Sequence, residues 1–220
     1  MKSLNKISSK YLLNTESEFQ QGTRNKILKN IPGVKKKSEI DKMEIEAYIN
    51  AENILIRKYD KDHRFDSDDI HYINKIFLGK IYDWAGKLRD VNISKEGFLF
   101  TSAFALPQAL NEFEINVLKK NTPCKGDLNK IISQIAEVHT ELLILHPYRE
   151  GNGRTARLLA TVMSYQAGNP GIDFGFIGSK GKEFNNYILA VQSGMDRNYK
   201  PMENIIERGI KLALKRFAKD

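Results

Sequence analysis

The chain has little cysteine and no long hydrophobic run. Cys124 is its one cysteine in 220 residues, so no intramolecular disulfide can form and a reducing, cytoplasmic setting is expected. No stretch approaches the roughly 18 consecutive apolar residues of a membrane-spanning helix. Residues 1–6 are not followed by the apolar core of a signal peptide. We therefore expect no membrane partner, although export by a leaderless route would leave no mark on the sequence.

Charge of one sign is in moderate excess. The formal net charge is +8 at pH 7, from 35 Lys and Arg against 27 Asp and Glu. A basic balance can indicate binding to nucleic acid, to anionic membrane or to a phosphorylated ligand. Because the lysines are scattered, we favour a solvated surface over a nucleic-acid-binding module. The length suits one main domain over residues 39–220, preceded by an extension over residues 1–38.

Helical spacing of apolar residues dominates the chain after residue 38. Asp66 is placed as the N-cap of a helix that we expect to break at Gly86. The β-type residues Val91, Ile93, Phe98 and Phe100 predict a small hairpin over residues 91–101. The pattern therefore indicates an all-α class with one short β element. Further helices are expected over about 39–58, 103–119, 128–145, 153–168, 180–193 and 201–217.

The helix over residues 128–145 has the clearest apolar stripe and is the predicted core helix. It should end at His146, because Pro147 cannot continue a helix and disfavours helical geometry in the residue before it. The next helix should begin near Gly153. The short loop between these two helices contains most of the chemically capable side chains in the sequence.

The second half of this loop is suited to binding phosphate. Gly151 and Gly153 flank Asn152, and glycines permit the backbone turns that point successive N–H groups at an anion. The N-terminus of the following helix adds a partial positive charge. Arg154 and Arg157 are three residues apart, so both project to one side of that helix and suit two adjacent phosphates. The pattern is neither a Walker A loop nor a dinucleotide-binding fingerprint.

The first half of the loop contains a base and a carboxylate. His146 has an ordinary pKa near 6.5, so its neutral form can take a proton from an attacking hydroxyl. Glu150 lies next to the phosphate-binding glycines, where a carboxylate would be repelled unless a cation lay between them. Mg²⁺ fits this position, since it favours one or two carboxylates together with phosphate oxygens.

Residues 146–157, His-Pro-Tyr-Arg-Glu-Gly-Asn-Gly-Arg-Thr-Ala-Arg, resemble the Fic signature His-Pro-Phe-x-Asp/Glu-Gly-Asn-Gly-Arg-x-x-Arg. The one departure is Tyr148 in place of Phe, an aromatic exchange that should keep its packing role. Residues 82–89, Tyr-Asp-Trp-Ala-Gly-Lys-Leu-Arg, resemble a second family segment that precedes a flap. The resemblance covers about residues 40–200 and implies a Fic-type helical bundle.

The resemblance implies transfer of AMP from ATP to a Tyr, Thr or Ser hydroxyl of a target protein, with release of pyrophosphate. His146 would be the base and Glu150 the Mg²⁺ ligand. Tyr187 would lie in the adenine pocket. The remaining roles fall on two groups of residues. Phosphate would be bound by Gly151, Asn152, Gly153, Arg154 and Arg157, and the target would dock on a flap of Gly97, Phe98, Leu99, Phe100 and Thr101.

Other activities of the same fold stay open: removal of AMP, or transfer of a different nucleotidyl group or of phosphocholine. Many Fic proteins carry an inhibitory Ser/Thr-x-x-x-Glu-Gly/Asn motif, whose glutamate competes for the γ-phosphate arginine. Residues 17–22 come closest but have Gln where Glu is needed, and Glu137 lies inside the core helix. We therefore expect inhibition in trans by a small antitoxin-like chain, in the manner of a toxin–antitoxin pair.

Overall fold

The computed structural model describes residues 18–24, 26–95 and 98–218, and these are mainly helical. The only two-stranded sheet among them is antiparallel and joins β1 (Ser94–Lys95) to β2 (Phe98–Leu99), with Ser94 opposite Leu99. Both the all-α class and the hairpin within residues 91–101 are confirmed. None of the helices in these ranges is long and apolar enough to cross a membrane.

The helices follow the predicted order along the chain. Short 3₁₀ turns lie at Ala103–Ala105 (η2), Gly175–Ile177 (η4) and Gly194–Asp196 (η5), and a π-helical turn at Glu114–Leu118 (η3). The α-helices are α1 (Lys37–Lys58), α2 (Ser67–Leu78), α3 (Leu106–Phe113), α4 (Lys119–Asn121), α5 (Leu128–Leu145), α6 (Asn152–Gln166), α7 (Lys182–Ser193) and α8 (Lys200–Phe217).

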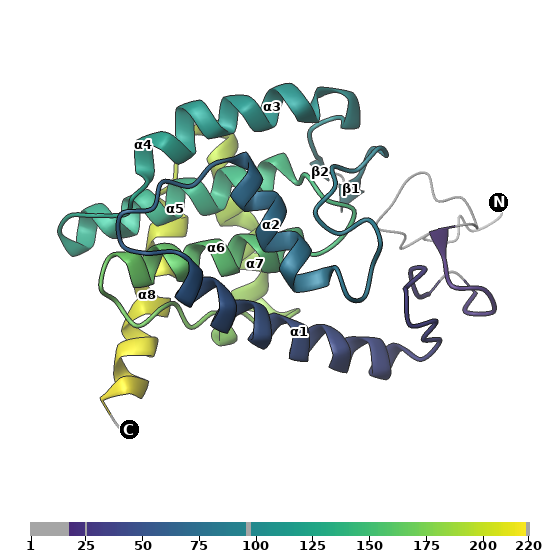
Figure 1. Cartoon of the computed structure of the whole chain (residues 1–220). Helices are drawn as coiled ribbons and strands as arrows, with labels where there is room; N and C mark the ends of the chain where they lie inside the picture. The colour runs from purple at the N-terminus through teal and green to yellow at the C-terminus, as the bar shows by residue number, and fades with distance from the viewer. Residues whose placement is uncertain (1–17, 25, 96–97, 219–220) are drawn as a thin grey trace, which may run out of the picture.

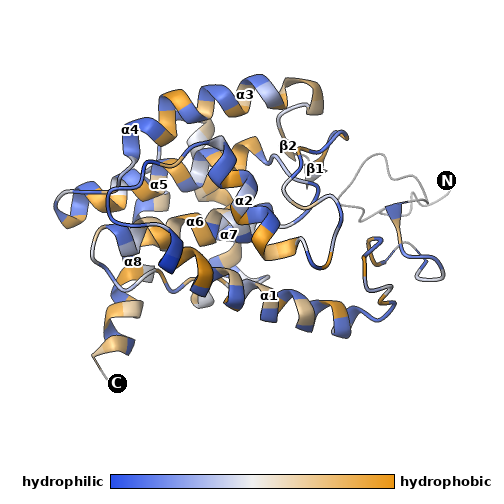
Figure 2. Cartoon of the chain, in the orientation of Figure 1, coloured by the Kyte–Doolittle hydropathy of each residue, from blue (hydrophilic) through white to orange (hydrophobic). Residues whose placement is uncertain are grey.

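Helix α5 is at the centre of the fold. It lies with α6 in the middle of Figure 1, between α1 along one side and the α3–α4 helix along the other. It packs against α6, α7 and α8. Its predicted apolar stripe is buried apart from Leu128, which is 42% exposed in the first turn. Asp127 caps that turn by accepting a hydrogen bond from the backbone N–H of Lys130. The outer helix α3 instead alternates hydrophobic and hydrophilic residues (Figure 2).

Helix α2 begins as predicted and ends earlier than predicted. Asp66 forms a capping box with Asp69, each side chain accepting from the backbone of the other. The expected break at Gly86 was wrong, because the helix ends at Leu78 and Gly79 is its C-cap. The backbone N–H groups of residues 81 and 82 both turn back to the Leu78 carbonyl. Gly86 instead donates its N–H to the buried side chain of Asn74 in α2.

The part of the extension that is described, residues 18–24 and 26–38, packs on the helical domain. Phe19 and Leu28 form an isolated antiparallel bridge, and the Ile31 N–H donates to the Ile81 carbonyl. The carboxylate of Glu18 forms an ion pair with Arg149, inside the loop that carries the signature. A boundary at residue 38 stays a prediction.

Gly209 in α8 tests how tightly this fold is packed. An alanine Cβ there would lie 2.5 Å from Ile172 Cγ2 and 3.1 Å from the Asp173 carbonyl oxygen. We expect Gly209→Ala to destabilise the protein by about 1–3 kcal/mol through overpacking, although alanine gains about 1 kcal/mol in helix propensity. Urea unfolding measures the change. Asn204→Ala, at an exposed position of the same helix, is the control, and an equal shift for both variants would contradict the packing explanation.

Candidate active site

His146 is held at a sharp turn where α5 ends. Its backbone is left-handed, with φ 50° and ψ 57°, and its N–H donates to the Leu142 carbonyl. The helix therefore ends where Pro147 predicted, but in αL rather than extended geometry. The ring Nδ1 lies 3.1 Å from the Leu143 carbonyl oxygen. Because a carbonyl only accepts, Nδ1 carries the proton of the neutral ring, and the basic lone pair lies on Nε2.

Arg89 joins this turn to both ends of the flap. Its Nε donates to the His146 carbonyl at 2.9 Å, and its guanidinium also donates to the carbonyls of Val91 and Thr101. Its own N–H donates to the Pro147 carbonyl. The side chain is buried, with 3% of the residue exposed. Sequence reasoning placed Arg89 only at the end of a family segment. The one available signal was a lone arginine directly before the β-type residues of the flap.

The flap brings an aromatic ring against His146. Phe100 stacks on the imidazole with ring centroids 3.8 Å apart and an interplanar angle of 20°. Phe98 contacts Phe100 edge to face, while Leu99 points outward and is 68% exposed. Gly97 lies outside the described residues. The flap thus supports the imidazole from one side and presents an apolar side chain to solvent.

The loop after His146 is closed from inside by Asn152. Its amide accepts from the Tyr148 N–H at 2.8 Å and donates to the Tyr148 carbonyl at 2.7 Å. The Tyr148 ring is fully buried, and its hydroxyl hydrogen-bonds to His71 Nδ1, which a Phe could not do. Gly151 has φ +80°, and a Cβ there would lie 2.6 Å from Leu78 Cδ1. The Asn152 side chain therefore shapes the loop, which leaves its backbone N–H for an anion.

Glu150 lies at the start of α6, where backbone donors converge. Its carboxylate accepts from the Gly151 N–H at 3.0 Å. Helix α6 begins at Asn152, and the first N–H groups of a helix have no partner within it, so this end attracts anions. The described residues contain no group of three His, Cys, Asp or Glu side chains that could hold a metal by themselves. A cation at Glu150 would need oxygens from a ligand or from water.

The two signature arginines have different environments. Arg154 Nη1 lies 2.5 Å from Glu44 Oε2, and its guanidinium lies over the Phe77 ring. The Arg157 Cζ lies over two aromatic rings, 5.5 Å from the centroid of Phe174 and 5.3 Å from that of Tyr187. Within the described ranges Arg157 forms no ion pair, and its buried Nε has no hydrogen-bond partner. Arg157 is half-buried, and a guanidinium with no ion pair and a buried Nε without a hydrogen-bond partner favours an anionic ligand.

Tyr187, which lines the pocket, is held in place by a hydrogen bond to a buried histidine. Its hydroxyl lies 2.8 Å from His139 Nε2, while His139 Nδ1 lies 3.1 Å from the Ala156 carbonyl oxygen. Nδ1 therefore donates to the carbonyl and Nε2 accepts from the tyrosine. Burial, with a smaller contribution from Arg157, lowers the pKa of His139 to about 3. Burial also raises the pKa of Tyr187, so both groups stay neutral at pH 7.

The structure brings most of the predicted residues to one pocket of about 230 Å³. Sequence reasoning missed its apolar wall on α7, where Phe184, Ile188 and Val191 recur at helical spacing. That periodicity was visible in the sequence but is equally typical of a core face. From the predicted set the lining includes Phe100, His146, Glu150, Gly151, Asn152, Gly153, Arg154, Arg157 and Tyr187.

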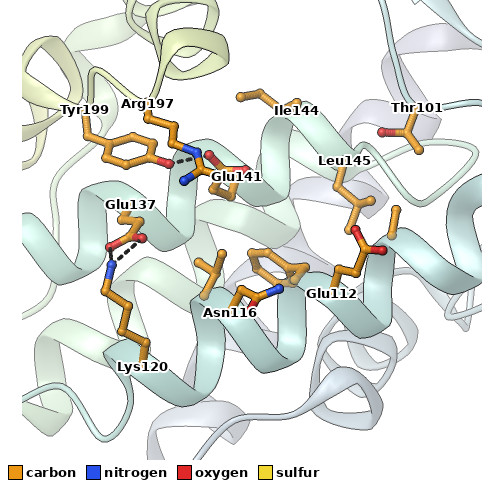
Figure 3. A pocket seen from close by; sticks show the side chains of 13 residues that line it. Thr101, Glu112, Asn116, Lys120, Glu137, Glu141, Ile144, Leu145, Arg197 and Tyr199 are labelled. Atoms are coloured by element: carbon orange, nitrogen blue, oxygen red, sulfur yellow. Dashed lines mark hydrogen bonds and ion pairs between the residues drawn. The ribbon is translucent and has the colours of Figure 1, made fainter.

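A second pocket, of about 460 Å³, lies between α3–η3, α5 and the start of α8 (Figure 3). Thr101 lines it, so this end of the flap turns away from the first pocket. Glu137 is bound there by Lys120 at 2.8 Å, and Glu141 accepts from the Tyr199 hydroxyl. Glu137, the glutamate inside the core helix, therefore lines a different pocket from Arg157.

Cys124 is excluded from this chemistry. It is fully buried, its Sγ lies 3.6 Å from the Gln134 side-chain oxygen, and burial raises the pKa of the thiol to about 12. A thiol that stays protonated is a poor nucleophile.

The Fic/DOC family model matches residues 64–164, which include α2, the flap, α5 and most of α6. The chain carries a Fic/DOC family domain. The chain is 27% identical over 142 residues to "Protein adenylyltransferase VbhT" of Bartonella schoenbuchensis, covering 64% of this chain and 30% of that protein. It is 31% identical over 101 residues to "Probable protein adenylyltransferase Fic" of Salmonella typhimurium, covering 44% of this chain and 48% of that protein. The matched part of the chain thus spans less than two thirds of the length of these relatives.

Solved structures agree on the fold. The N-terminal Fic domain of a putative cell filamentation protein from Bartonella quintana has a TM-score of 0.70 at 22% identity, covering 93% of this chain and 98% of that one. The BepC protein of Bartonella tribocorum, solved with bound AMPPNP, has a TM-score of 0.68 at 22% identity, covering 87% and 95%. At these identities the likeness concerns the backbone of the Fic domain.

His139 makes stability depend on pH. Its folded pKa of about 3 lies below its ordinary value of 6.5, so between these values the unfolded chain binds the proton and the folded protein does not. The contribution of His139 to the free energy of unfolding is therefore fully present above pH 6.5. It is lost as the pH falls towards 3, by at most about 1.4 kcal/mol per pH unit. Urea midpoints from pH 7.5 to 5 should fall less steeply in His139→Gln than in the wild type. Parallel curves would contradict this assignment.

Proposed function

We propose that this protein is a protein adenylyltransferase, which transfers AMP from ATP to a hydroxyl side chain of a target protein. The single observation that supports this best is the convergence of His146, Glu150, the N-terminus of α6 and Arg157 on one pocket. A base, a metal ligand, backbone donors and a guanidinium are the groups that such a transfer needs. The names of the similar proteins VbhT and Fic agree with this activity.

His146 is the base in this proposal. Nε2 takes the proton of the target hydroxyl as its oxygen forms a bond to the α-phosphorus of ATP. The bond from that phosphorus to the oxygen bridging to the β-phosphate breaks, and pyrophosphate leaves with the electron pair. The Leu143 carbonyl keeps the proton on Nδ1, and the stacked Phe100 ring restricts rotation of the imidazole. Both contacts hold the basic nitrogen in one direction.

Glu150 fits a magnesium site that ATP completes. Mg²⁺ is usually bound by one or two carboxylates together with phosphate oxygens and water, and Glu150 supplies one carboxylate beside the N-terminus of α6. The ion would offset phosphate charge that the carboxylate alone would repel. We expect EDTA to abolish transfer and Mg²⁺ to restore it.

The rest of the pocket suits the other parts of ATP. The backbone N–H groups at Gly151, Asn152 and Gly153 would bind phosphate oxygens, and Arg154 and Arg157 would contact the β- and γ-phosphates. The apolar wall of α7 and the Tyr187 ring would receive adenine.

The flap would dock the target by adding a strand to the hairpin edge, since it carries a two-stranded sheet and the exposed Leu99. We further propose a cytoplasmic site of action and control by a separate antitoxin-like chain. In the described ranges no carboxylate forms an ion pair with Arg157.

Replacement of the base should stop transfer without unfolding the protein. His146→Ala removes the imidazole but keeps the pocket, so we expect no label to pass from α-³²P-ATP to any protein, while ATP binding persists. Incubation with Mg²⁺, labelled ATP and lysate, followed by gel analysis and mass spectrometry, measures this and identifies the transferred group. Labelling equal to the wild type would remove His146 from the reaction.

Loss of Arg157 should weaken ATP binding. A charge-assisted contact to phosphate contributes about 1.5–3 kcal/mol, so Arg157→Ala should raise the ATP Kd by roughly 10- to 150-fold. Calorimetric titration measures the Kd directly. Arg64→Ala, which removes an exposed arginine outside the pocket, is the control. An unchanged Kd in Arg157→Ala would place the γ-phosphate elsewhere.

A further inference from the structure

Glu44 links Arg154 of the phosphate pocket to Tyr82 of residues 82–89, the second segment that resembles the Fic family. It belongs to α1, more than a hundred residues before the signature, and only 8% of it is exposed. Both of its oxygens are engaged. Oε2 accepts from Arg154 Nη1 at 2.5 Å, and Oε1 accepts from the Tyr82 hydroxyl at 2.6 Å. No feature of the sequence pattern singled this residue out.

These contacts restrict Arg154 on two sides. Glu44 holds one edge of the guanidinium, and the Phe77 ring lies 4.9 Å from its Cζ and covers one face. A guanidinium has five N–H donors, and this carboxylate uses one of the two on Nη1. Because Arg154 also lines the 230 Å³ pocket, its remaining donors are available to a ligand there.

Glu44 is itself fixed in place. It lies on the buried side of α1 with Ile40, Ala51 and Leu55, so it cannot withdraw without unpacking the helix. Its partner Tyr82 is 3% exposed and stacks on Trp84, with ring centroids 4.6 Å apart. The residues 82–84 and α1 thus form a rigid support behind Arg154. A carboxylate that is buried, doubly hydrogen-bonded and anchored suits a permanent structural contact better than a blocking group that must leave.

We infer that Glu44 is a positioning residue, which holds the Arg154 guanidinium ready to contact the β- and γ-phosphates of ATP. The assignment of these phosphates rests on the proposed function. An arginine side chain that is ordered before its ligand arrives loses less conformational entropy on binding. The two arginines then have separate tasks. Arg157 offers an uncompensated charge, while Arg154, whose charge Glu44 largely balances, offers donors in a fixed direction.

The test compares ATP with AMP, which lacks the β- and γ-phosphates. Glu44→Gln keeps the size of the side chain but removes its charge, so Arg154 should lose its fixed position. We expect the Kd for ATP with Mg²⁺ to rise by about 5- to 20-fold, and the Kd for AMP to change by less than about twofold. Glu46→Gln, the same exchange at an exposed position of α1, is the matched control and should leave both constants unchanged.

A double-mutant cycle shows whether Glu44 acts through Arg154. In an Arg154→Gln background, Glu44→Gln should have no further effect on ATP binding. Tyr82→Phe removes one support of the carboxylate and should weaken ATP binding by a smaller factor. It also keeps the test usable if Glu44→Gln does not fold, as thermal unfolding would reveal.

Three results would overturn the inference. Tighter ATP binding or faster labelling by Glu44→Gln would identify a competing, inhibitory glutamate. An equal loss of ATP and AMP binding would indicate general damage to the pocket. A further loss in the Arg154→Gln background would show that Glu44 acts by another route. All the binding measurements are independent of transfer, so a selective loss of ATP affinity would support the inference even if no target protein were ever labelled.

Discussion

The left-handed turn at His146 is the constraint on which the rest of the site depends. A non-glycine residue in this conformation costs about 1–2 kcal/mol, so the turn needs support from its surroundings. Arg89 supplies it through the bond from its Nε to the His146 carbonyl, and the Leu143 carbonyl holds the ring. Because Arg89 also binds Val91 and Thr101, the same side chain sets the flap against the imidazole. One buried guanidinium thus couples the proposed base to the surface on which a target would dock.

Within the signature the side chains divide into those that build the loop and those that face the pocket. Tyr148 is buried, and Asn152 closes the loop on it, while Arg149 pairs with Glu18 from the N-terminal extension. Glu150 and Arg157 line the pocket. This division explains how so short a stretch holds several groups at fixed positions. The side chains that build the loop fix its backbone, and the fixed backbone sets the positions of the side chains that face the pocket.

Acidic residues from the N-terminal quarter of the chain complete the loop. Glu18 pairs with Arg149, and Glu44 pairs with Arg154, across sequence separations of more than a hundred residues. The described part of the extension is therefore in contact with the signature loop through at least one ion pair. Arg157 receives no such partner in the described ranges, and this contrast sets it apart as the arginine most in need of an anion.

Much of the architecture follows from local pattern. The apolar stripe of α5, the Asp66 cap, the stop before Pro147 and the hairpin could be predicted, because helical periodicity, capping and proline chemistry act within a few residues. The signature residues could also be named, since their order along the chain is itself the pattern. The predicted end of α2 was wrong, because the turn at residues 79–82 depends on backbone hydrogen bonds to the Leu78 carbonyl.

Only the tertiary structure decided what each signature residue contacts. Local spacing placed Arg154 and Arg157 on one side of α6. It could not show that Glu44 compensates the charge of Arg154, or that two aromatic rings contact Arg157. Nor could it show that Arg89 supports His146. These contacts join residues that are distant in sequence, and they are set by how helices pack rather than by any local preference. The sequence by itself determined which chemical groups are present and in what order, and the packing of α1, α2 and the flap around α5 and α6 determined which of them meet.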